Sequence, residues 1–190
     1  MSEKYSVVNI RAYIDNEELN DILMSFSCPI NHDVEKFLLH NSVNFTRKDQ
    51  SVTYLVFSED NFELAGYFSI AVKPISVLAS VLSNSMRRKI SRVSVLNEDT
   101  STYTASAYFI AQLGKNFALP EDKRINGSAL LNMAHDIIFH AKYFLGGVIE
   151  FLECEDKPQL MNFYHQNGFK FFNSRITQDN VNLNQLLRFI

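Results

Sequence analysis

One uncharged stretch, Thr100 to Gly114, constrains the fold of this chain more than any other segment. Ser, Thr and Gln side chains interrupt its apolar residues, so the stretch is too short and too polar to cross a bilayer. A strand in the middle of a sheet suits such a sequence, because both of its faces are covered. We therefore predict a buried central strand from about Thr102 to Gly114.

The length of 190 residues predicts one domain over residues 1–190 that needs no disulfide or metal to hold its core. Hydrophobic residues make up 46% and charged residues 21%, which argues against a disordered chain or a coiled coil. The net charge of −3 disfavours a general nucleic-acid coat but allows a local basic patch.

Two features of the sequence predict a cytoplasmic protein without a membrane partner. Met1 to Arg11 carries no apolar signal core. Cys28 and Cys154 lie far apart without metal-type spacing, which is typical of small core residues in a reducing compartment.

Strands and helices alternate along the rest of the chain, and this order predicts an α/β or α+β fold with helices on the faces of one sheet. Asn31 is expected to cap an early helix, Pro74 to end a strand, and Asp156 to cap a late helix. Helices are expected at 17–26, 75–90 and from Gly127 to the Gly146-Gly147 pair; strands are expected at 5–13, 51–57, 62–72, 148–154, 169–172 and 186–190.

The loop that opens the helix at Gly127 is a candidate phosphate site. It reads Arg124-Ile125-Asn126-Gly127-Ser128-Ala129. A helix start offers backbone N–H groups and a partial positive charge, and small residues let a pyrophosphate approach that backbone. On these six residues alone, a solvent loop with a glycine near a helix start is an equally good interpretation.

A second segment near the end of the chain, Phe163-Tyr164 followed by Gly168-Phe169, gives this loop a context. Together the two segments resemble the GNAT superfamily of acetyl-CoA-dependent N-acetyltransferases. Arg124, Gly127 and Ala129 occupy the family's loop signature, and the aromatic-Tyr and Gly-Phe pairs occupy its second signature. The front half, including residues 26–28, 53–56 and 66–71, resembles the branch of acetyltransferase toxins of toxin–antitoxin pairs.

The resemblance implies a fold and a set of roles. The sheet would be mixed, have about six to seven strands and be splayed, with helices on both faces. Acetyl-CoA would be the co-substrate, and its pantetheine arm would follow the backbone of Leu113, Gly114 and Lys115. Its pyrophosphate would meet Arg124, Ile125, Asn126, Gly127, Ser128 and Ala129, and Tyr164 would donate a proton to the leaving thiolate. The segment from Lys115 to Asn126 is longer than is usual in the family, which leaves the individual phosphate contacts open.

The acceptor and the general base stay open. Glu153 and Glu155 are the nearest candidate bases, but a solvated strand end is the simpler interpretation, and water can take the proton. The spacing of five between His135 and His140 disfavours a metal site, so we expect no metal. The basic segment Arg87, Arg88, Lys89 and Arg92 is interpreted either as a solvated helix end or as a contact for RNA phosphates.

Three functions follow from the resemblance. The first is acetyl transfer to a primary amine. The second is a toxin that acetylates aminoacyl-tRNA, with charged tRNA and an antitoxin as partners. The third is a CoA-binding module without turnover. A homodimer is compatible with each of them.

Overall fold

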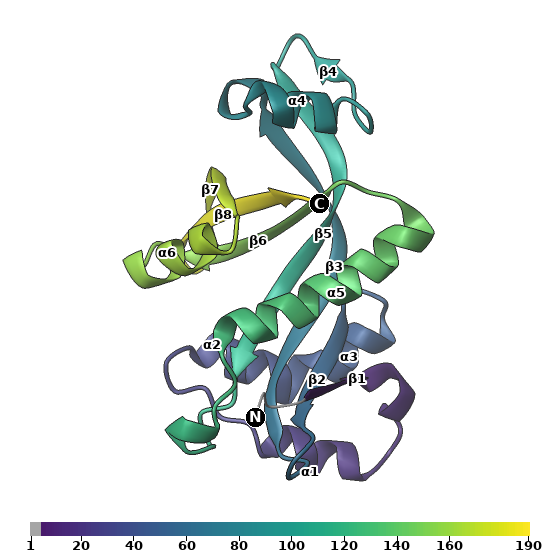
Figure 1. Cartoon of the computed structure of the whole chain (residues 1–190), viewed down its shortest axis with the longest axis vertical. Coiled ribbons are helices and arrows are strands. Elements are labelled where there is room, and N and C mark those ends of the chain that lie inside the picture. The colour runs from purple at the N-terminus through teal and green to yellow at the C-terminus, as the bar shows by residue number, and fades with distance from the viewer. Residues whose placement is uncertain (1–4) are drawn as a thin grey trace. The chain divides into compact units, whose positions relative to one another are not determined.

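The computed structural model describes residues 5–190, and the chain divides into two compact units. Unit 1 comprises the described part of Met1–Ala71 together with Ala111–Ile137, and unit 2 comprises Val72–Ile110 with Ile138–Ile190. Strands β3 (Leu64–Leu78) and β5 (Thr102–Lys115) and helix α5 (Gly127–Leu145) each contribute to both units (Figure 1). One domain over residues 1–190 stays a prediction.

Unit 1 is built on strands in the order β1-β2-β3-β5. Strands β1 and β2 pair antiparallel from Tyr5↔Ser58 to Asn9↔Tyr54, and β2 pairs antiparallel with β3 as far as Val52↔Ile70. The other elements of unit 1 are β1 (Tyr5–Asn9), η1 (Ile10–Tyr13), α1 (Glu18–Met24), α2 (His32–Lys36), η2 (Phe37–Asn41), α3 (Ser42–Arg47), β2 (Val52–Ser58) and η4 (Glu121–Lys123).

Helices cover both faces of the sheet in unit 1. Successive residues of a strand point to opposite faces. A Cβ on Gly66 would lie 3.3 Å from Leu130 of α5, whereas the next residue, Tyr67, packs its ring 5.2 Å from Phe26 and donates to the carbonyl of Val34. Helix α5 therefore lies on one face, and the α1–α2 region lies on the other.

Unit 2 is built on strands in the order β3-β5-β6-β8-β7, with β4 paired to β5. Strands β5 and β6 are parallel, whereas the pairs β4–β5, β6–β8 and β7–β8 are antiparallel. Its remaining elements are η3 (Ala79–Val81), α4 (Asn84–Ile90), β4 (Leu96–Asn97), β6 (Ile149–Glu155), α6 (Pro158–Gln166), β7 (Lys170–Ile176) and β8 (Asn182–Phe189).

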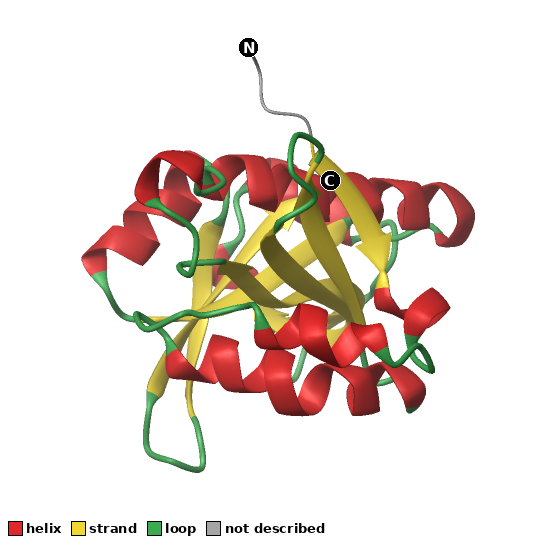
Figure 2. Ribbon diagram, turned by 90° about the horizontal axis from the view of Figure 1, so that it is seen from below, coloured by secondary structure: helices red, strands yellow, loops and turns green. Residues whose placement is uncertain are grey.

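The fold class expected from the sequence is confirmed: the sheet is mixed and open, and helices flank it (Figure 2). The parallel ladder between β5 and β6 runs only from Tyr108↔Glu150 to Ile110↔Leu152, although β5 continues to Lys115. This early end of the ladder is the splay that the resemblance implied. The sheet has eight strands rather than six or seven, because the short β4 adds one. Within residues 5–190, no helix has the length and apolar character that a membrane span requires.

Four local expectations were wrong. The strand expected at 5–13 ends at Asn9, because Ile10–Tyr13 forms a 3-10 helix that Asn9 caps by accepting from the N–H of Arg11 at 2.9 Å. Strand β3 continues through Pro74 to Leu78, and the segment expected as one helix from Ile75 is strand, η3 and the short α4. Pairing of β3 with β2 ends at Ile70, so the missing N–H of Pro74 removes no bond to β2. Asp156 does not cap α6: it accepts a hydrogen bond from Asn184 Nδ2 at 3.0 Å, and Lys157 stands at the N-cap.

Candidate functional site

The start of helix α5 presents backbone donors. Asn126 Oδ1 accepts from the N–H of Ser128 at 2.8 Å and so caps the first turn. The N–H groups of Gly127 and Ala129 make no hydrogen bond with residues 5–190. The first turn of this 19-residue helix carries no acidic side chain that would neutralise its partial positive charge. This end can therefore receive an anion.

Arg124 and Ile125 shape the loop before this helix. Arg124 Nε donates to the carbonyl of Leu119 at 2.9 Å, Nη2 donates to the carbonyl of Phe117 at 3.3 Å, and the guanidinium lies 4.9 Å from the Phe117 ring centre. The Ile125 side chain is fully buried. Arg124 therefore holds the loop closed, and only its Nη1 stays outside these bonds. A phosphate contact by Arg124 stays a prediction.

Asn116, which sequence analysis did not single out, anchors the long segment between β5 and α5. Its buried side chain accepts from the N–H of Ser27 at 3.0 Å and donates to the carbonyls of Ser25 at 3.1 Å and Leu64 at 2.8 Å. A buried amide that is satisfied this fully fixes local geometry. A lone Asn after a strand gives no sequence signal for such a role.

The end of β5 offers backbone groups on one side. The carbonyl oxygen of Gly114 would lie 2.7 Å from a Cβ on Gly66, so this carbonyl faces β3. The neighbouring residues Leu113 and Lys115 turn their backbone groups the opposite way, because these groups alternate along a strand. The ladder with β6 includes β5 only as far as Ile110, so Leu113 and Lys115 are not part of it. An extended ligand can bond there as an added strand would.

Gly114 itself is needed for packing. A Cβ on this residue would lie 2.5 Å from Val34 Cγ1, 3.0 Å from the Tyr67 ring and 3.1 Å from the Phe26 ring. The absence of a side chain at this position lets the α1–α2 region rest directly on β5.

Tyr164 lies on α6 with its ring buried between Phe163, at a centroid distance of 5.0 Å, and Phe169, at 6.0 Å. Its hydroxyl makes no hydrogen bond with residues 5–190. Burial, followed by the nearby Cys154 thiol, raises the pKa of Tyr164 well above its ordinary value. The phenol therefore keeps its proton at neutral pH, and residues 5–190 supply no acceptor for that proton.

A buried ion pair fixes the turn after Tyr164. Glu150, whose side chain is fully buried, accepts from Arg188 Nε. Arg188 Nη1 donates to the carbonyl of Asn167 at 3.1 Å, and the guanidinium lies 5.1 Å from the Phe169 ring centre. Gly168 between them has a φ of +85°, which favours glycine. Arg188 thus holds the Gly-Phe pair of the second signature in place.

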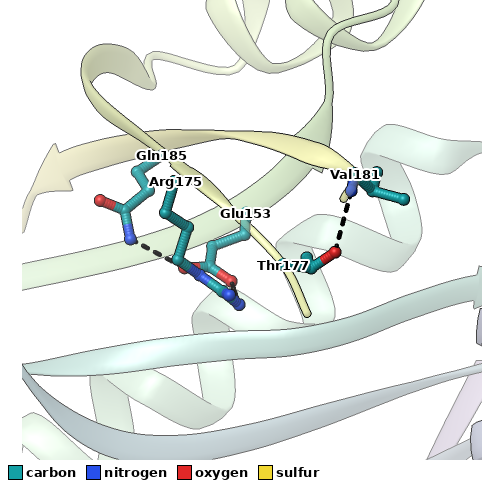
Figure 3. A network of polar contacts seen from close by, with 5 residues as sticks. All are labelled: Glu153, Arg175, Thr177, Val181 and Gln185. Carbon is teal, nitrogen blue, oxygen red and sulfur yellow. Dashed lines mark hydrogen bonds and ion pairs between the residues drawn. The ribbon is translucent and has the colours of Figure 1, made fainter. Parts of the chain in front are cut away.

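Glu153, the first candidate base, belongs to a polar network (Figure 3). Arg175 Nε donates to Glu153 Oε1 at 2.7 Å and Nη2 donates to Oε2 at 2.5 Å, while Gln185 Nε2 donates to Oε1 at 2.8 Å. Burial raises the pKa of Glu153, but these hydrogen bonds and the charges of Arg175 and Lys73 outweigh it and leave the pKa below its ordinary value. Glu153 is therefore ionised and a weak base. Glu155 pairs with Lys157 at 2.9 Å.

The basic segment lies on and after α4 and is exposed. Arg87 Nε donates to the carbonyls of Ala79 at 2.9 Å and Leu82 at 3.2 Å, so it closes the turn before α4. Lys89 lies 6.0 Å from the Phe189 ring centre. Within residues 5–190, the side chains of Arg88 and Arg92 make no hydrogen bond, ion pair or ring contact. They are therefore better candidates than Arg87 and Lys89 for contacts with RNA phosphates.

The predicted residues fall into two groups, one in each unit. Leu113 to Lys115 and Arg124 to Ala129 lie in unit 1, while Tyr164 and the basic segment lie in unit 2. Residues 5–190 contain no group of three His, Cys, Asp or Glu side chains placed to hold a metal ion.

The mixed splayed sheet and the helix that begins after its long strand give the chain the fold of GNAT acetyltransferases. A putative GNAT-family acetyltransferase from Desulfovibrio desulfuricans is similar at a TM-score of 0.50 and 14% identity, over 97% of this chain and 98% of that one. AtaT complexed with acetyl-methionyl-tRNAfMet is similar at a TM-score of 0.66 and 14% identity, over 95% of this chain and 94% of that one.

A third solved structure is a tyrosine-to-phenylalanine variant of the AtaT toxin, bound to the C-terminus of the antitoxin AtaR and to acetyl-CoA. It has a TM-score of 0.62 and 13% identity, over 98% of this chain and 93% of that one. The resemblance to GNAT enzymes and to their toxin branch is thereby confirmed for the fold. No protein-family profile matches the sequence, and no curated protein matches it.

Proposed function

We propose that this chain is an N-acetyltransferase that transfers the acetyl group of acetyl-CoA to a primary amine. The observation that carries the proposal is the pair of N–H groups of Gly127 and Ala129 at the start of α5, which have no hydrogen-bond partner among residues 5–190. The backbone of Leu113 and Lys115 supports it, since it matches the strand-like binding of a pantetheine arm. The AtaT variant, which has a similar fold, was solved bound to acetyl-CoA.

In the proposed reaction, the amine nitrogen attacks the thioester carbonyl carbon. A C–N bond forms, the C–S bond breaks, and the thiolate leaves. Tyr164 gives its hydroxyl proton to the thiolate sulfur, and the amine gives its surplus proton to water. A phenol is protonated at neutral pH and can therefore serve as the proton donor. Glu153 is not assigned as the base, because its carboxylate already accepts three hydrogen bonds.

Aminoacyl-tRNA is the second candidate acceptor, and it implies an antitoxin as a further partner. One solved structure contains AtaT in complex with acetyl-methionyl-tRNA, and another contains an AtaT variant bound to the C-terminus of its antitoxin. The exposed Arg88 and Arg92 favour the same acceptor. A CoA-binding module without turnover is the remaining alternative, and a homodimer stays a prediction.

Acetyl-CoA binding tests the proposal first. At a hundredfold excess over Kd, a ligand that binds only the folded state adds about 2.7 kcal/mol, which is about 5 to 11 °C in Tm for a chain of this size. Gly127→Val blocks the approach to the backbone N–H groups. The φ angle of Gly127 is not positive, so a valine can adopt the backbone conformation at this position. We expect an unchanged Tm without ligand and a lost shift with it. An intact shift in the folded variant contradicts the assignment.

Turnover tests Tyr164. Tyr164→Phe keeps the buried ring and removes only the hydroxyl, so acetyl-CoA binding should persist while kcat falls about tenfold to a thousandfold. Steady-state release of free CoA measures the effect. Full turnover would show that another group protonates the thiolate, and loss of acetyl-CoA binding would show that the hydroxyl is structural.

A further inference from the structure

An apolar groove lies beside helix α1 in unit 1. It consists of two hollows, of about 210 and about 410 Å³, which adjoin because Ile22 and Phe57 belong to the lining of both. Val8, Leu19 and Leu55 also line the smaller hollow, and Phe62, Leu64 and Leu119 also line the larger one. The groove is therefore formed by β1, α1 and the hairpin of β2 and β3, with Leu119 from the segment before α5.

The floor of the groove belongs to the core of unit 1. Leu55 and Phe57 point to the same face of β2, because side chains alternate along a strand. Leu19 and Leu55 are buried in one hydrophobic cluster, and Ile22 and Phe57 pack against that cluster while they stay partly exposed. Core packing thus holds Ile22 and Phe57 in place at the surface, as in a pre-formed binding site.

Phe62 forms part of the wall of the larger hollow in an unfavourable backbone conformation. Its side chain is 80% exposed, and its φ is +57°, which a bulky residue rarely adopts. The turn is closed by hydrogen bonds from the N–H of Phe62 to the carbonyl of Ser58 at 2.9 Å and from the N–H of Ser58 to the carbonyl of Glu63 at 3.0 Å. Strain of this kind is typical of binding sites.

The charged groups of the groove are acidic. Glu18 lines the smaller hollow, Asp21 and Glu63 line the larger one, and neither lining includes a Lys, Arg or His. These three carboxylates form no ion pair within residues 5–190. Residues 12–30 and 50–72, which supply most of the lining, contain seven acidic residues and no basic one. The groove therefore combines apolar surface with a negative rim.

We propose that this groove is a docking surface for another protein, which binds through an amphipathic segment with apolar side chains on one side and Lys or Arg beside them. Apolar side chains would enter the two hollows, and the cations would meet Glu18, Asp21 and Glu63. Amphipathic segments are commonly bound by apolar grooves in this way. The proposal goes beyond acetyl transfer, because the groove contains none of the residues assigned to that reaction.

The charge of the rim selects this occupant over others. Nucleic acids and anionic membranes present phosphate groups, which the carboxylates repel. A neutral apolar ligand would use the hollows but leave the three carboxylates without cations. A second copy of this chain could offer its basic segment on α4, so the oligomeric state must be measured as part of the test.

The probe is a fluorescein-labelled peptide of about 14 residues, or four helical turns, that consists of Leu and Lys with the Leu residues at helical spacing. A matched peptide has Glu in place of every Lys. Fluorescence anisotropy with the full chain measures Kd for both peptides. We expect the Leu-Lys peptide to bind at least about tenfold more tightly, and its Kd to rise with salt, which screens exposed charges.

Phe62→Gly tests the apolar part of the groove. Glycine adopts a positive φ without strain, so this variant should have a Tm at least as high as that of the unmodified chain. Kd for the Leu-Lys peptide should nevertheless rise about tenfold or more, as it does when a central aromatic contact is lost. Phe144→Ala is the matched control, because Phe144 is 78% exposed and belongs to the other unit.

Glu18→Gln/Asp21→Asn tests the acidic rim. Loss of two exposed charges should raise Kd for the Leu-Lys peptide about threefold to tenfold and weaken its dependence on salt. Glu98→Gln/Asp99→Asn is the matched control, because it changes two exposed acidic residues in the other unit. This control should leave Kd unchanged, and Tm shows that each variant is folded.

Three results would overturn the proposal. The first is that the Leu-Lys peptide does not bind, or binds no better than the Leu-Glu peptide. The second is that the groove variants and their controls lose the same affinity. The third is a dimer in sedimentation equilibrium that Phe62→Gly converts to a monomer, because the groove would then hold a second copy. The acetyl-CoA shift in Tm should be intact in Phe62→Gly, so the two proposals stand or fall separately.

Discussion

Replacing Arg188 by Met should destabilise the protein strongly, because it leaves the Glu150 carboxylate buried without its cation. The side chain of Glu150 is 0% exposed and that of Arg188 is 22% exposed, so the pair is largely removed from water. Removing one partner of a buried pair costs about 3 to 5 kcal/mol. For a chain of this size, that loss lowers Tm by about 6 to 20 °C.

Urea unfolding followed by circular dichroism measures the free energy of unfolding, with the slope on urea concentration as a check that the unfolded state is unchanged. Arg47→Met is the matched control, because Arg47 pairs with Asp15 at 2.7 Å on the surface, with side-chain exposures of 55% and 87%. Such an exposed pair contributes less than about 1 kcal/mol.

The double variant Glu150→Leu/Arg188→Met completes the cycle. It removes both charges, so it should recover at least about 2 kcal/mol relative to Arg188→Met, since apolar replacement of a buried pair is often neutral. A loss below about 1 kcal/mol in Arg188→Met, or a double variant less stable than the single one, would refute the reasoning that the buried charge needs its partner.

Two further predictions concern the thiols and the basic segment. Burial, then Asp156 and Glu155, raise the pKa of Cys154 to about 11, and burial also raises the pKa of Cys28. Because very little of either thiol is ionised at pH 7, both thiols should resist iodoacetamide until the protein unfolds. Rapid labelling of the native protein, measured by mass spectrometry, would contradict this prediction. Arg88→Gln/Arg92→Gln should weaken binding of charged tRNA and reduce the slope of log K against log salt by about two units, while leaving the acetyl-CoA shift in Tm unchanged. The control is Lys36→Gln/Lys48→Gln, which changes two exposed lysines in the other unit. Equal effects of the two double variants would show that the basic segment does not bind RNA.

Long local patterns made the central part of the fold predictable. The uncharged run became β5, the apolar stripe after it became α5 from Gly127, and Asn31 caps α2 by accepting from the N–H groups of Asp33 and Val34. Each of these features depends on neighbours in the sequence, which is the information that periodicity and capping rules contain.

The failures depended on partners far away in the chain. Pro74 is accommodated within β3 where the ladder with β2 has ended, which only the register reveals. Glu153 could be named as a candidate base from its place in the order, but Arg175 and Gln185, which hold it ionised, come from two later strands. The residue types predicted Glu153 as a candidate base, but its hydrogen bonds to Arg175 and Gln185 make it a weak one.

A cavity of about 350 Å³ in unit 2 is lined in part by the rings of Phe109, Phe151 and Phe172. Because Phe172 is the extra residue of a β-bulge in β7, this lining depends on the length of the strand. Loss of this single residue would restore regular pairing between β7 and β8 and leave both strands intact, yet it would remove one aromatic wall of the cavity. Insertions and deletions usually accumulate in loops, where they spare the core. In this chain, one codon gained or lost within β7 changes the aromatic lining of the cavity without rebuilding the sheet, so the length of a strand sets the shape of a surface hollow.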